Sequence, residues 1–500
     1  MKPITTWAKR LWGVSAAVTA LRLILAVFTP LSPQETYYWV YSLHPALSYY
    51  DHPPLAAYTI LFFTRLFGHT GPAVRLGPVL YALGASWLVY LIGKRLFHEK
   101  IGFWAAVLLN LLPTFSLTAL FMTPDCPLLF FWCLAVFGAL KAVQDNRLAL
   151  YLPAGLSLGL ALLSKYTAVF LPFSLFLFLF LSPAHRFHLK RWEPYAGLLL
   201  ALTVFSPVLI WNARNDWVSF AFQSVERAGT VKGVQVDEFF GFLASQTGIL
   251  TPPVFVGMIW ALGLGIKRAV RQPSWPETLL LALSLPLVLF FGTVALFEWV
   301  KINWLIPAYP PVVLLMTAYF QKGWLIRKKD KVLNRVVWGT AILFFLLLHS
   351  APFLPQIPLS GSTDTLTGWP ELAAHLERIQ REHAGFGDQR PFVFAWGHKT
   401  ASELQFYLKG RPETYAQNVL GKKALAYDYW FDPRPLIGRD ALFVWSELDP
   451  FPDEKSGLLE QFFKRVEPLE PFTVYRGKTP LRTFRISRCY HYLGPEGKKG

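Results

Sequence analysis

The 500-residue chain has few cysteines, few acidic residues and few charges of either sign. Its 3 Cys residues are too few for the disulfide framework of a small secreted domain. Charged residues make up 16% of the chain, whereas a soluble domain carries roughly 25%. The 31 acidic and 48 basic residues give a net charge of +17, which can indicate a nucleic-acid partner. The basic residues lie in short loops between apolar segments, however, and this placement argues against nucleic acid.

Apolar residues dominate the composition of the chain. Hydrophobic residues make up 53% of the chain, with 19 Trp and 42 Phe. Stretches long enough to cross a bilayer recur through the first two thirds of the chain, and we count about eleven of them. A further apolar stretch, residues 54–67, is short and ends near Arg65, so we expect it to lie along the membrane surface. The predicted spans are Leu11–Phe28, Ala73–Leu91, Gly102–Phe121, Pro127–Val143, Ala149–Leu163, Ala168–Leu181, Tyr195–Trp211, Thr247–Ile266, Thr278–Phe297, Trp304–Phe320 and Val332–Phe353.

Lys and Arg residues gather in alternate loops between these spans. Cytoplasmic loops of membrane proteins carry an excess of such residues, so these loops and the N-terminus face the cytoplasm. An odd number of spans then places the C-terminus outside. The first span has no small-residue cleavage site, which is typical of an uncleaved anchor. We predict a multi-pass protein of the cell inner membrane, in contact with membrane lipids, whose C-terminal part is periplasmic or extracellular. The basic loops are 94–100, 141–147, 185–191, 267–271 and 322–331.

The composition changes after Phe353, which predicts two domains. Residues 1–353 form the α-helical membrane domain, and residues 354–500 form a soluble α/β domain that begins with a linker at 355–363. The segment HKTAS (398–402) is either a ligand loop or a strand-to-helix turn, and we favour the turn. The predicted helices of this domain are 368–383, 402–408 and 455–464, and its predicted strands are 391–396, 440–445, 471–475 and 482–486.

Acidic, aromatic and histidine residues gather directly after the first span, on the predicted outer side. Glu35 stands beside Tyr37 and Tyr38, and Asp51 and His52 follow in the same stretch. Aromatic side chains of this kind are typical of the membrane–water boundary. Acids held there suggest chemistry on a molecule that is itself partly lipid, and an interfacial loop with solvated acids is the alternative.

Charged residues on other predicted outer segments have two interpretations each. Asp125 opens a span, where it either caps the helix or belongs to a site. Lys165 either reaches the lipid headgroups or holds a phosphate as a point charge. Arg22 lies inside the first span, where an unpaired cation is costly, so it requires a carboxylate or a lipid phosphate. Arg75 is an outer-edge cation of the same kind.

Two further outer segments carry polar groups. Asn212 and Asp216 begin a predicted loop of roughly 30 residues, long enough to suggest function. Its aromatic and amide side chains suit sugar binding, and a plain interfacial loop is the alternative. Glu298 and Lys301 are three residues apart and are expected to pair locally unless they belong to the site. Together, cations for phosphate and carboxylates for acid–base work fit sugar transfer from a polyprenyl-phosphate carrier.

Five motifs carry a family resemblance. They are QETYYW (34–39), YDHPP (50–54), TPDCP (123–127), SKYT (164–167) and KINW (301–304). With these motifs, the chain resembles the bacterial branch of the dolichyl-phosphate-mannose–protein mannosyltransferase family (glycosyltransferase family 39), and it is similar to lipid A aminoarabinose transferases of the same GT-C fold. The resemblance covers roughly the whole membrane part, and the first two motifs at their spacing are the most specific.

The resemblance implies an inverting transfer in which an acid of the first outer loop is the base. The family's usual loop motif is Asp-Glu, whereas this chain has Gln34-Glu35, so the usual aspartate is absent. Asp51 and His52 occupy the place where relatives bind a metal or the carrier phosphate. Lys165 corresponds to a carrier-phosphate contact, and a divalent metal ion is the one cofactor that the resemblance suggests.

We therefore expect a polyprenyl-phosphate-sugar-dependent glycosyltransferase that acts on a lipid, glycan or protein hydroxyl at the outer membrane face. Glu35, Asp51 and Asp125 are expected to converge in one cavity, and we rank them in that order as the proton acceptor. The alternatives are a polyprenyl-linked sugar transporter or flippase and a non-catalytic carbohydrate-binding membrane protein. The predicted substrate-binding residues are Arg22, Tyr37, Tyr38, His52, Arg75, Lys165, Asn212, Asp216 and Lys301.

Overall fold

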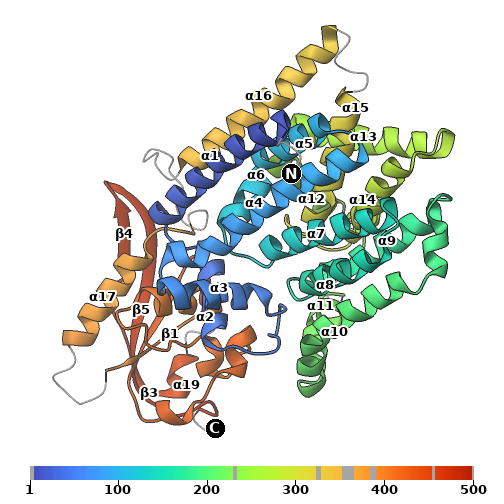
Figure 1. Cartoon of the computed structure of the whole chain (residues 1–500). Helices are drawn as coiled ribbons and strands as arrows, with labels where there is room; N and C mark the ends of the chain where they lie inside the picture. Colours follow the sequence, from blue (N-terminus) through green and yellow to red (C-terminus); the bar gives the residue numbers. More distant parts are fainter. Residues whose placement is uncertain are drawn as a thin grey trace. The chain divides into compact units, whose positions relative to one another are not determined.

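The computed structural model describes residues 5–228, 233–321, 328–351, 365–382, 390–452 and 457–497. The chain divides into two compact units, and Figure 1 follows its course. The membrane unit comprises residues 1–27 and 46–350, and the sheet unit comprises residues 28–45 and 351–500. Residues 28–45 thus group with the C-terminal residues, and the domain boundary after residue 353 stays a prediction.

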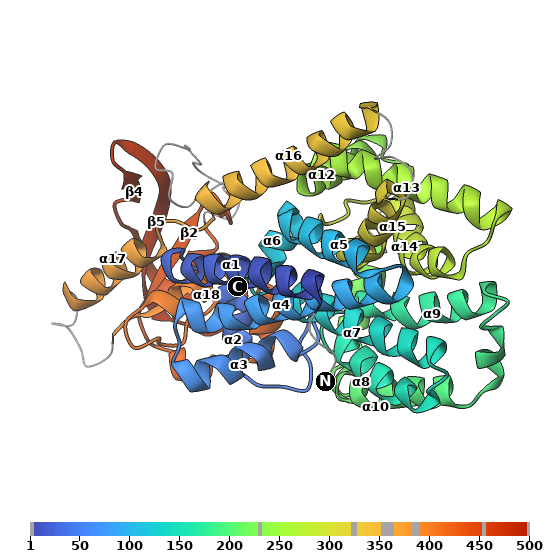
Figure 2. The ribbon, with the colours of Figure 1, turned by 45° about the horizontal axis from the view of Figure 1, so that its top comes forward.

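The membrane unit is built from apolar helices (Figures 1 and 2). Among the described residues, six helices are long and apolar enough to cross a membrane, or seven if one bent pair counts as a single span. Five shorter apolar helices accompany them, so the protein is a multi-pass membrane protein, while the number of about eleven spans stays a prediction. The helices are α1 (Thr6–Phe28), α3 (Leu55–Phe67), α4 (Gly71–Leu96), α5 (Glu99–Leu111), α6 (Pro113–Leu120), α7 (Asp125–Gln144), α8 (Tyr151–Leu162), α9 (Phe170–Leu181), α10 (Glu193–Arg214), α11 (Val218–Ala228), α12 (Val236–Leu250), α13 (Pro252–Arg271), α14 (Trp275–Val294), α15 (Tyr309–Tyr319) and α16 (Lys328–Ser350).

The predicted span Gly102–Phe121 is a bent pair of helices rather than one straight helix. Two helices, α5 and α6, occupy this segment and meet at an angle of 73°. Leu112 between them is extended, at φ −69° and ψ 132°, and Pro113 is the first residue of α6. A residue before proline is pushed out of the helical conformation, and proline lacks the N–H that would continue the helix. The apolar composition predicted the segment correctly, but the proline breaks it.

Two corrections concern the region after α10. The stretch predicted as an outer loop contains the helix α11 and most of α12. The predicted span Thr247–Ile266 is interrupted because α12 ends at Leu250 and α13 begins at Pro252. Thr251 between them has a φ of +66°, which a helix does not permit. Hydropathy alone did not detect these breaks, since both flanking helices are apolar.

Helices α8 and α10 approach closely enough that two glycines are required where they meet. A Cβ atom on Gly155 of α8 would lie 2.0 Å from the carbonyl oxygen of Gly197 on α10. A Cβ atom on Gly197 would lie 2.5 Å from the carbonyl oxygen of Tyr151. Small residues that let helix backbones approach closely are common in membrane helix packing. The glycine contact therefore fixes the distance between these two helices.

The sheet unit contains a five-stranded sheet in the order β1-β2-β5-β3, with β4 pairing beside β3 along β5. β1 and β2 are parallel, with Phe394 opposite Phe443, and β5 is antiparallel to β2, β3 and β4. The long strand β5 pairs with β4 through its first half and with β3 through its second half. This confirms the predicted C-terminal α/β domain. The strands are β1 (Phe392–Ala395), β2 (Ala441–Ser446), β3 (Phe463–Pro468), β4 (Phe472–Arg476) and β5 (Thr479–Tyr492).

The helices of the sheet unit are α2 (Pro33–Leu43), α17 (Trp369–Glu382), α18 (His398–Tyr407) and α19 (Leu459–Phe462), and α2 packs on α18. The HKTAS segment forms the start of α18. The helix predicted over residues 455–464 is wrong at its end, because β3 begins at Phe463. Its aromatic residues at 462 and 463 pack into the core of the sheet, and this tertiary burial overrides the helical pattern. The predicted linker 355–363 and residues 322–327 of one basic loop lie outside the described residues.

Candidate functional site

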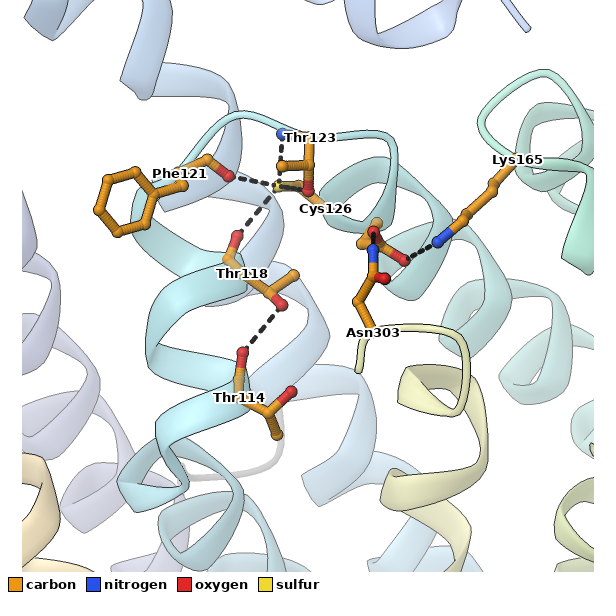
Figure 3. A network of polar contacts seen from close by, with 8 residues as sticks. Thr114, Thr118, Phe121, Thr123, Cys126, Lys165 and Asn303 are labelled. Carbon is orange, nitrogen blue, oxygen red and sulfur yellow. Dashed lines mark hydrogen bonds and ion pairs between the residues drawn. The ribbon is translucent and has the colours of Figure 1, made fainter. Parts of the chain in front are cut away.

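A buried carboxylate with two partners lies where α7 begins. Asp125 is in the first turn of α7, and Lys165 follows α8. The Lys165 ammonium group donates to Oδ1 of Asp125 at 2.7 Å, and the Asn303 amide donates to Oδ2 at 2.6 Å. Figure 3 shows Lys165 and Asn303 reaching the helix start from different segments of the chain. Three elements distant in sequence thus meet at one acid.

The ion pair is nearly closed off from solvent. Asp125 is 2% exposed and Lys165 is 6% exposed. Asp125 does not act as the helix cap, because Pro124 occupies that position and the cap has no side-chain hydrogen bond. Lys165 does not extend away to a distant surface either. A buried ion pair is costly to assemble, and removing either partner leaves an uncompensated charge. The arrangement therefore holds the Lys165 cation in place, and Asp125 does more than stabilise the start of a helix.

The loop before Asp125 is fixed by a cysteine. The Cys126 thiol lies 3.0 Å from the carbonyl oxygen of Thr118 and 3.1 Å from that of Phe121. The backbone N–H of Thr123 points at the same sulfur at 3.4 Å (Figure 3). These contacts satisfy carbonyl groups at the end of α6, which a helix leaves without partners. The start of α7, which carries Asp125, is therefore attached to the end of α6 through Cys126.

The turn that contains Asp51 and His52 is attached to α11 by side-chain contacts. Ser219 donates its hydroxyl to the carbonyl oxygen of Tyr49 at 3.0 Å, and the Gln223 amide donates to that of Asp51 at 2.8 Å. Asp51 is 7% exposed, and the ring of Phe220 on α11 lies 5.4 Å from the ring of Tyr166. Tyr166 is the neighbour of Lys165, so this turn lies beside the segment that carries the cation.

A backbone hydrogen bond joins the same two segments. The N–H of Leu55, which begins α3, donates to the carbonyl oxygen of Leu163 at 3.0 Å. Asn212 at the end of α10 is fully buried and braces α11, because its amide accepts from the Ser219 N–H at 3.1 Å and donates to Val208. Within the membrane unit, the predicted residues Asp51, Asp125, Lys165 and Asn212 therefore gather around residues 163–166.

Other predicted residues of the membrane unit lie elsewhere. Asp216 is exposed in a turn with a φ of +52°, and Lys301 is exposed in the turn after α14. Arg75 is fully buried, with its guanidinium carbon 5.0 Å from the centre of the Phe121 ring.

Arg22 is buried without the carboxylate that we expected. It is 1% exposed and lies 5.5 Å from the centre of the Phe115 ring. Its Nε and Nη2 atoms have no hydrogen-bond partner in the part of the chain that the structure describes. A cation above an aromatic face gains part of the stabilisation that a counter-ion would supply. A lipid phosphate as the partner of Arg22 stays a prediction.

Glu35 has a structural role at the start of α2. Ser32 precedes the helix, and both its N–H and its hydroxyl donate to Oε2 of Glu35, at 2.9 Å and 3.1 Å. The Glu35 N–H donates back to the Ser32 hydroxyl, which completes a capping box. Glu35 is fully buried. Its role as proton acceptor stays a prediction, as does the convergence of the three acids, because Glu35 belongs to the sheet unit.

The aromatic residues after Glu35 lie inside the sheet unit. The sequence pattern placed Tyr37 and Tyr38 at a membrane–water boundary, whereas they are 0% and 3% exposed. The Tyr37 hydroxyl accepts from the N–H of Ala426 at 3.3 Å, and its ring lies 4.5 Å from the His398 ring. Rings spaced along one short helix pack as readily on a protein core as on headgroups. A substrate-binding role for these two residues stays a prediction.

A metal centre is not supported by the described residues. They contain no group of three or more His, Cys, Asp and Glu side chains that could hold a metal ion together. Asp51 and His52 are adjacent and supply at most part of a ligand set, whereas a protein metal site usually takes more ligands. No step of the chemistry below is assigned to a metal, and the predicted metal role of Asp51 and His52 stays a prediction.

Comparison with known proteins identifies the fold and the class of enzyme. A family model described as dolichyl-phosphate-mannose-protein mannosyltransferase matches residues 51–211, which include Asp51, Asp125 and Lys165. Crystal structures of ArnT from Cupriavidus metallidurans, apo and bound to undecaprenyl phosphate, match with TM-scores of 0.64 and 0.63. Both are 15% identical, cover 96% and 97% of this chain, and are themselves covered to 98%.

Relatives with assigned activities agree with this match. The lipid A galacturonosyltransferase RgtD of Rhizobium johnstonii is 28% identical over 345 residues, which cover 68% of this chain and 71% of the relative. The protein is a membrane glycosyltransferase with the GT-C fold. The undecaprenyl phosphate-alpha-4-amino-4-deoxy-L-arabinose arabinosyl transferase 2 of Proteus mirabilis is 24% identical over 343 residues, covering 61% of this glycosyltransferase and 59% of the relative.

Sequence reasoning missed several residues of this glycosyltransferase site. Asn303 stands in the KINW motif, where the charged Lys301 was the more conspicuous residue, but Lys301 is exposed. An amide between the apolar residues Ile302 and Trp304 was the available signal, because such an amide requires hydrogen-bond partners. Ser219 and Gln223 were missed because they act on backbone carbonyl groups, and sequence gives no sign of such long-range contacts.

Proposed function

We propose that this glycosyltransferase moves a single sugar from a polyprenyl-phosphate carrier to a hydroxyl group of a lipid A-type glycolipid. The acceptor oxygen bonds to the anomeric carbon while the bond between that carbon and the phosphate oxygen breaks. The acceptor proton passes to a protein carboxylate, and the bonding electron pair leaves with the polyprenyl phosphate. The names of the relatives support both the lipid-phosphate donor and the lipid A acceptor.

The observation that carries this proposal is the buried cation at Lys165. Its ammonium group has three N–H donors, and Asp125 takes one of them. Asp125 is the one partner of this group recorded among the described residues, so the other donors can bind the oxygens of a phosphate, where negative charge grows as the carrier leaves. Asp125, which is itself held by the Asn303 amide, keeps the cation in position before the donor arrives. Preorganised charge of this kind is a large contribution to catalysis because it needs no rearrangement during the reaction.

We propose that the proton acceptor is a carboxylate of the protein. Asp125 ranks last for this role, because both its oxygens already accept hydrogen bonds from Lys165 and Asn303. Asp51 and Glu35 rank above it, and Glu35 remains our first choice because it stands in the loop where relatives carry their acid. An acid that accepts a proton in the transition state contributes typically 10²- to 10⁴-fold to the rate.

We propose that the N-terminus is cytoplasmic and that the C-terminal domain lies outside the inner membrane. The distribution of Lys and Arg supports this orientation. Maleimide labelling of single-cysteine variants tests it, since the three native cysteines are buried and should react little. Lys422→Cys in the exposed part of the sheet unit should react in intact spheroplasts, and Lys190→Cys should react only after permeabilisation. The reverse pattern would contradict the orientation.

A transfer assay tests the activity. Purified protein receives lipid A and undecaprenyl phosphate that carries labelled galacturonic acid or 4-amino-4-deoxy-L-arabinose. Label on lipid A together with free undecaprenyl phosphate supports transfer. Movement of intact carrier across liposomes without cleavage would support a flippase instead, and carrier binding with neither outcome would support a non-catalytic protein.

A further inference from the structure

The sheet unit contains a polar cavity at the start of α2, next to the capping box of Ser32 and Glu35. Its volume is about 160 Å³, and it lies among the starts of α2, α17 and α18. Its wall includes Ser32, Gln34, Trp369, Lys399 and Asp449. All of these residues belong to the same compact unit. A carboxylate, an ammonium group, an amide and a hydroxyl therefore face one small space.

The carboxylate of Asp449 is held in place from two sides. The Thr400 hydroxyl donates to its Oδ2 at 3.1 Å. On the other side lies Gly397, whose φ of +102° favours glycine and whose missing side chain leaves room for the acid. A Cβ atom there would be 2.3 Å from Oδ2 and 2.4 Å from Cγ of Asp449. The backbone at residue 397 is thus shaped around this carboxylate.

The lining of the cavity fits a sugar. Thr400 occupies one of the roughly four lone-pair positions of the Asp449 carboxylate, and the remainder can accept from neighbouring hydroxyl groups. Gln34 adds an amide that both donates and accepts, whereas the Ser32 hydroxyl is already engaged with Glu35 and only shapes the wall. The volume accommodates one monosaccharide rather than an oligosaccharide. Lys399 is exposed at the rim, where its compact charge can contact an anionic substituent.

Trp369 shapes the cavity rather than offering a stacking surface. Its indole N–H donates to the carbonyl oxygen of Thr365 at 3.0 Å, and the Arg482 guanidinium carbon lies 5.0 Å from the centre of the ring. With one face covered by Arg482 and only 1% of the residue exposed, the ring fixes the cavity wall. Recognition in this cavity therefore depends on hydrogen bonds and charge, which discriminate among sugars strongly.

We propose that this cavity binds a hydroxyl-bearing monosaccharide unit of the acceptor glycolipid, with Asp449 accepting hydrogen bonds from its hydroxyl groups. Lys399 at the rim contacts an anionic group carried by that acceptor. The inference rests on the proposed function and adds to it the site that selects the acceptor. The sugar of the donor has the same hydroxyl chemistry, so the experiment must separate the two sources.

Asp449→Asn tests the inference, because asparagine keeps the shape of the side chain and removes its charge. Asp432→Asn is the matched control, since Asp432 is exposed and paired with Arg434 at 2.8 Å. The KM values for lipid A and for the labelled carrier are measured separately, together with equilibrium binding of fluorescent lipid A to protein in nanodiscs. We expect Asp449→Asn to raise the KM for lipid A about 10- to 100-fold, as for loss of a hydrogen bond to a charged group.

Each outcome has a distinct meaning. A rise in the carrier KM with an unchanged lipid A KM would assign the cavity to the donor sugar and overturn our proposal. The proposal would also be overturned if the native protein transfers sugar and the Asp449→Asn variant has the same KM for lipid A as the native protein. If the native protein transfers no sugar but lipid A binding still depends on Asp449, the proposed function fails and the cavity assignment stands.

Lys399→Met provides a second variant that does not depend on the fold around Asp449. Lys399 is exposed, so its removal should leave the structure intact. We expect weaker binding of phosphorylated lipid A by about 3- to 10-fold and little change for dephosphorylated lipid A. Equal loss for both forms, or no loss for either, would contradict the role of Lys399 at the rim.

Discussion

The starts of α7 and α2 each carry an acid in the first turn, yet the two acids do different work. At α2, Glu35 closes a capping box with Ser32, three residues away. At α7, the cap has no side-chain hydrogen bond, and Asp125 reaches Lys165 and Asn303, which are 40 and 178 residues away in sequence. Both acids are almost fully buried.

The difference shows that an acid at a helix start has two possible roles that sequence alone does not separate. A local partner anchors the acid at its own helix start, and removal of that partner should affect mainly stability. Distant partners make it part of a site, and its removal should affect mainly the reaction. Variants of the partners therefore test the comparison more cleanly than variants of the acids, because they leave the acids in place.

The largest effect is expected for Lys165→Met. The variant keeps the apolar stem but removes the cation that we assign to the leaving phosphate. Turnover in the transfer assay should fall about 100- to 1000-fold, as for loss of one preorganised group that stabilises developing charge. Lys94→Met is the matched control, because Lys94 also pairs with an acid, Glu99, but is exposed. The turnover of Lys94→Met should match that of the native protein. An equal loss of turnover in both variants would contradict the assignment of Lys165 to the leaving phosphate.

Glu35→Gln should reduce turnover on the order of 100-fold if Glu35 is the proton acceptor. Glutamine at this position also completes a capping box, so the variant removes the charge and preserves the start of α2. Turnover is measured with the labelled carrier and lipid A. Activity that survives Glu35→Gln but is lost in Asp51→Asn or Asp125→Asn would transfer the role to that acid.

Ser32→Ala is expected to act on stability rather than on the reaction. It removes the hydroxyl partner of Glu35 and leaves the carboxylate, so unfolding should become easier by about 1 kcal/mol, the usual effect of losing an N-cap. Thermal unfolding in detergent measures the change, and Ser224→Ala, on an exposed helix residue, is the control. Loss of turnover without loss of stability would show that the cap serves the reaction directly.

The smallest effect concerns Asp449 and pH. Burial raises the pKa of this acid, which the nearby Thr400 and Lys399 lower only in part. Folding therefore favours its protonated form, so its contribution to stability is present at low pH and is lost as the pH rises through its folded-state pKa. Asp449→Asn removes that loss, so the unfolding midpoint of the variant should rise relative to that of the native protein as the pH increases above the unfolded-state pKa of about 4.

Asp432→Asn should show the opposite sign. The Arg434 guanidinium lowers the pKa of Asp432, so this acid stabilises the fold above its unfolded-state pKa and loses that contribution as the pH falls. The Asp432→Asn variant should therefore be slightly less stable than the native protein at neutral pH, and the two should be equally stable in acid. Parallel pH profiles for the two variants would contradict the environments assigned to both acids.

Much of the helical framework was predictable because apolar runs directly reflect burial in lipid or in a helix bundle. The sequence did not reveal where such runs break. Pro113 was visible as a possible breaker, but Thr251 adopts its positive φ only in the folded chain. The strand at Phe463 was missed because its pattern is compatible with a helix until the sheet offers it a partner.

The site was predictable in its parts and not in its contacts. The motifs pointed to Asp125 and Lys165, and the structure joins them directly. Nothing in the sequence linked Asn303 to the same acid or Gln223 to the carbonyl group of Asp51, since both contacts cross long stretches of chain. Asp449 was missed for the same reason, because its significance comes from the space beside Gly397.

The glycine contact between α8 and α10 fixes the distance between these two helices at one point along their length. Gly155 lies ten residues before Lys165, and Gly197 lies on the helix that ends beside Asn212. A single methyl group at either glycine would tilt one helix against the other, and the resulting displacement grows with distance from the contact. A displacement of about 1 Å at a reacting group can lower a rate about 100-fold. The position of the Lys165 ammonium group thus depends on a contact more than two helical turns away, where Gly155 and Gly197 each have a hydrogen atom in place of a side chain.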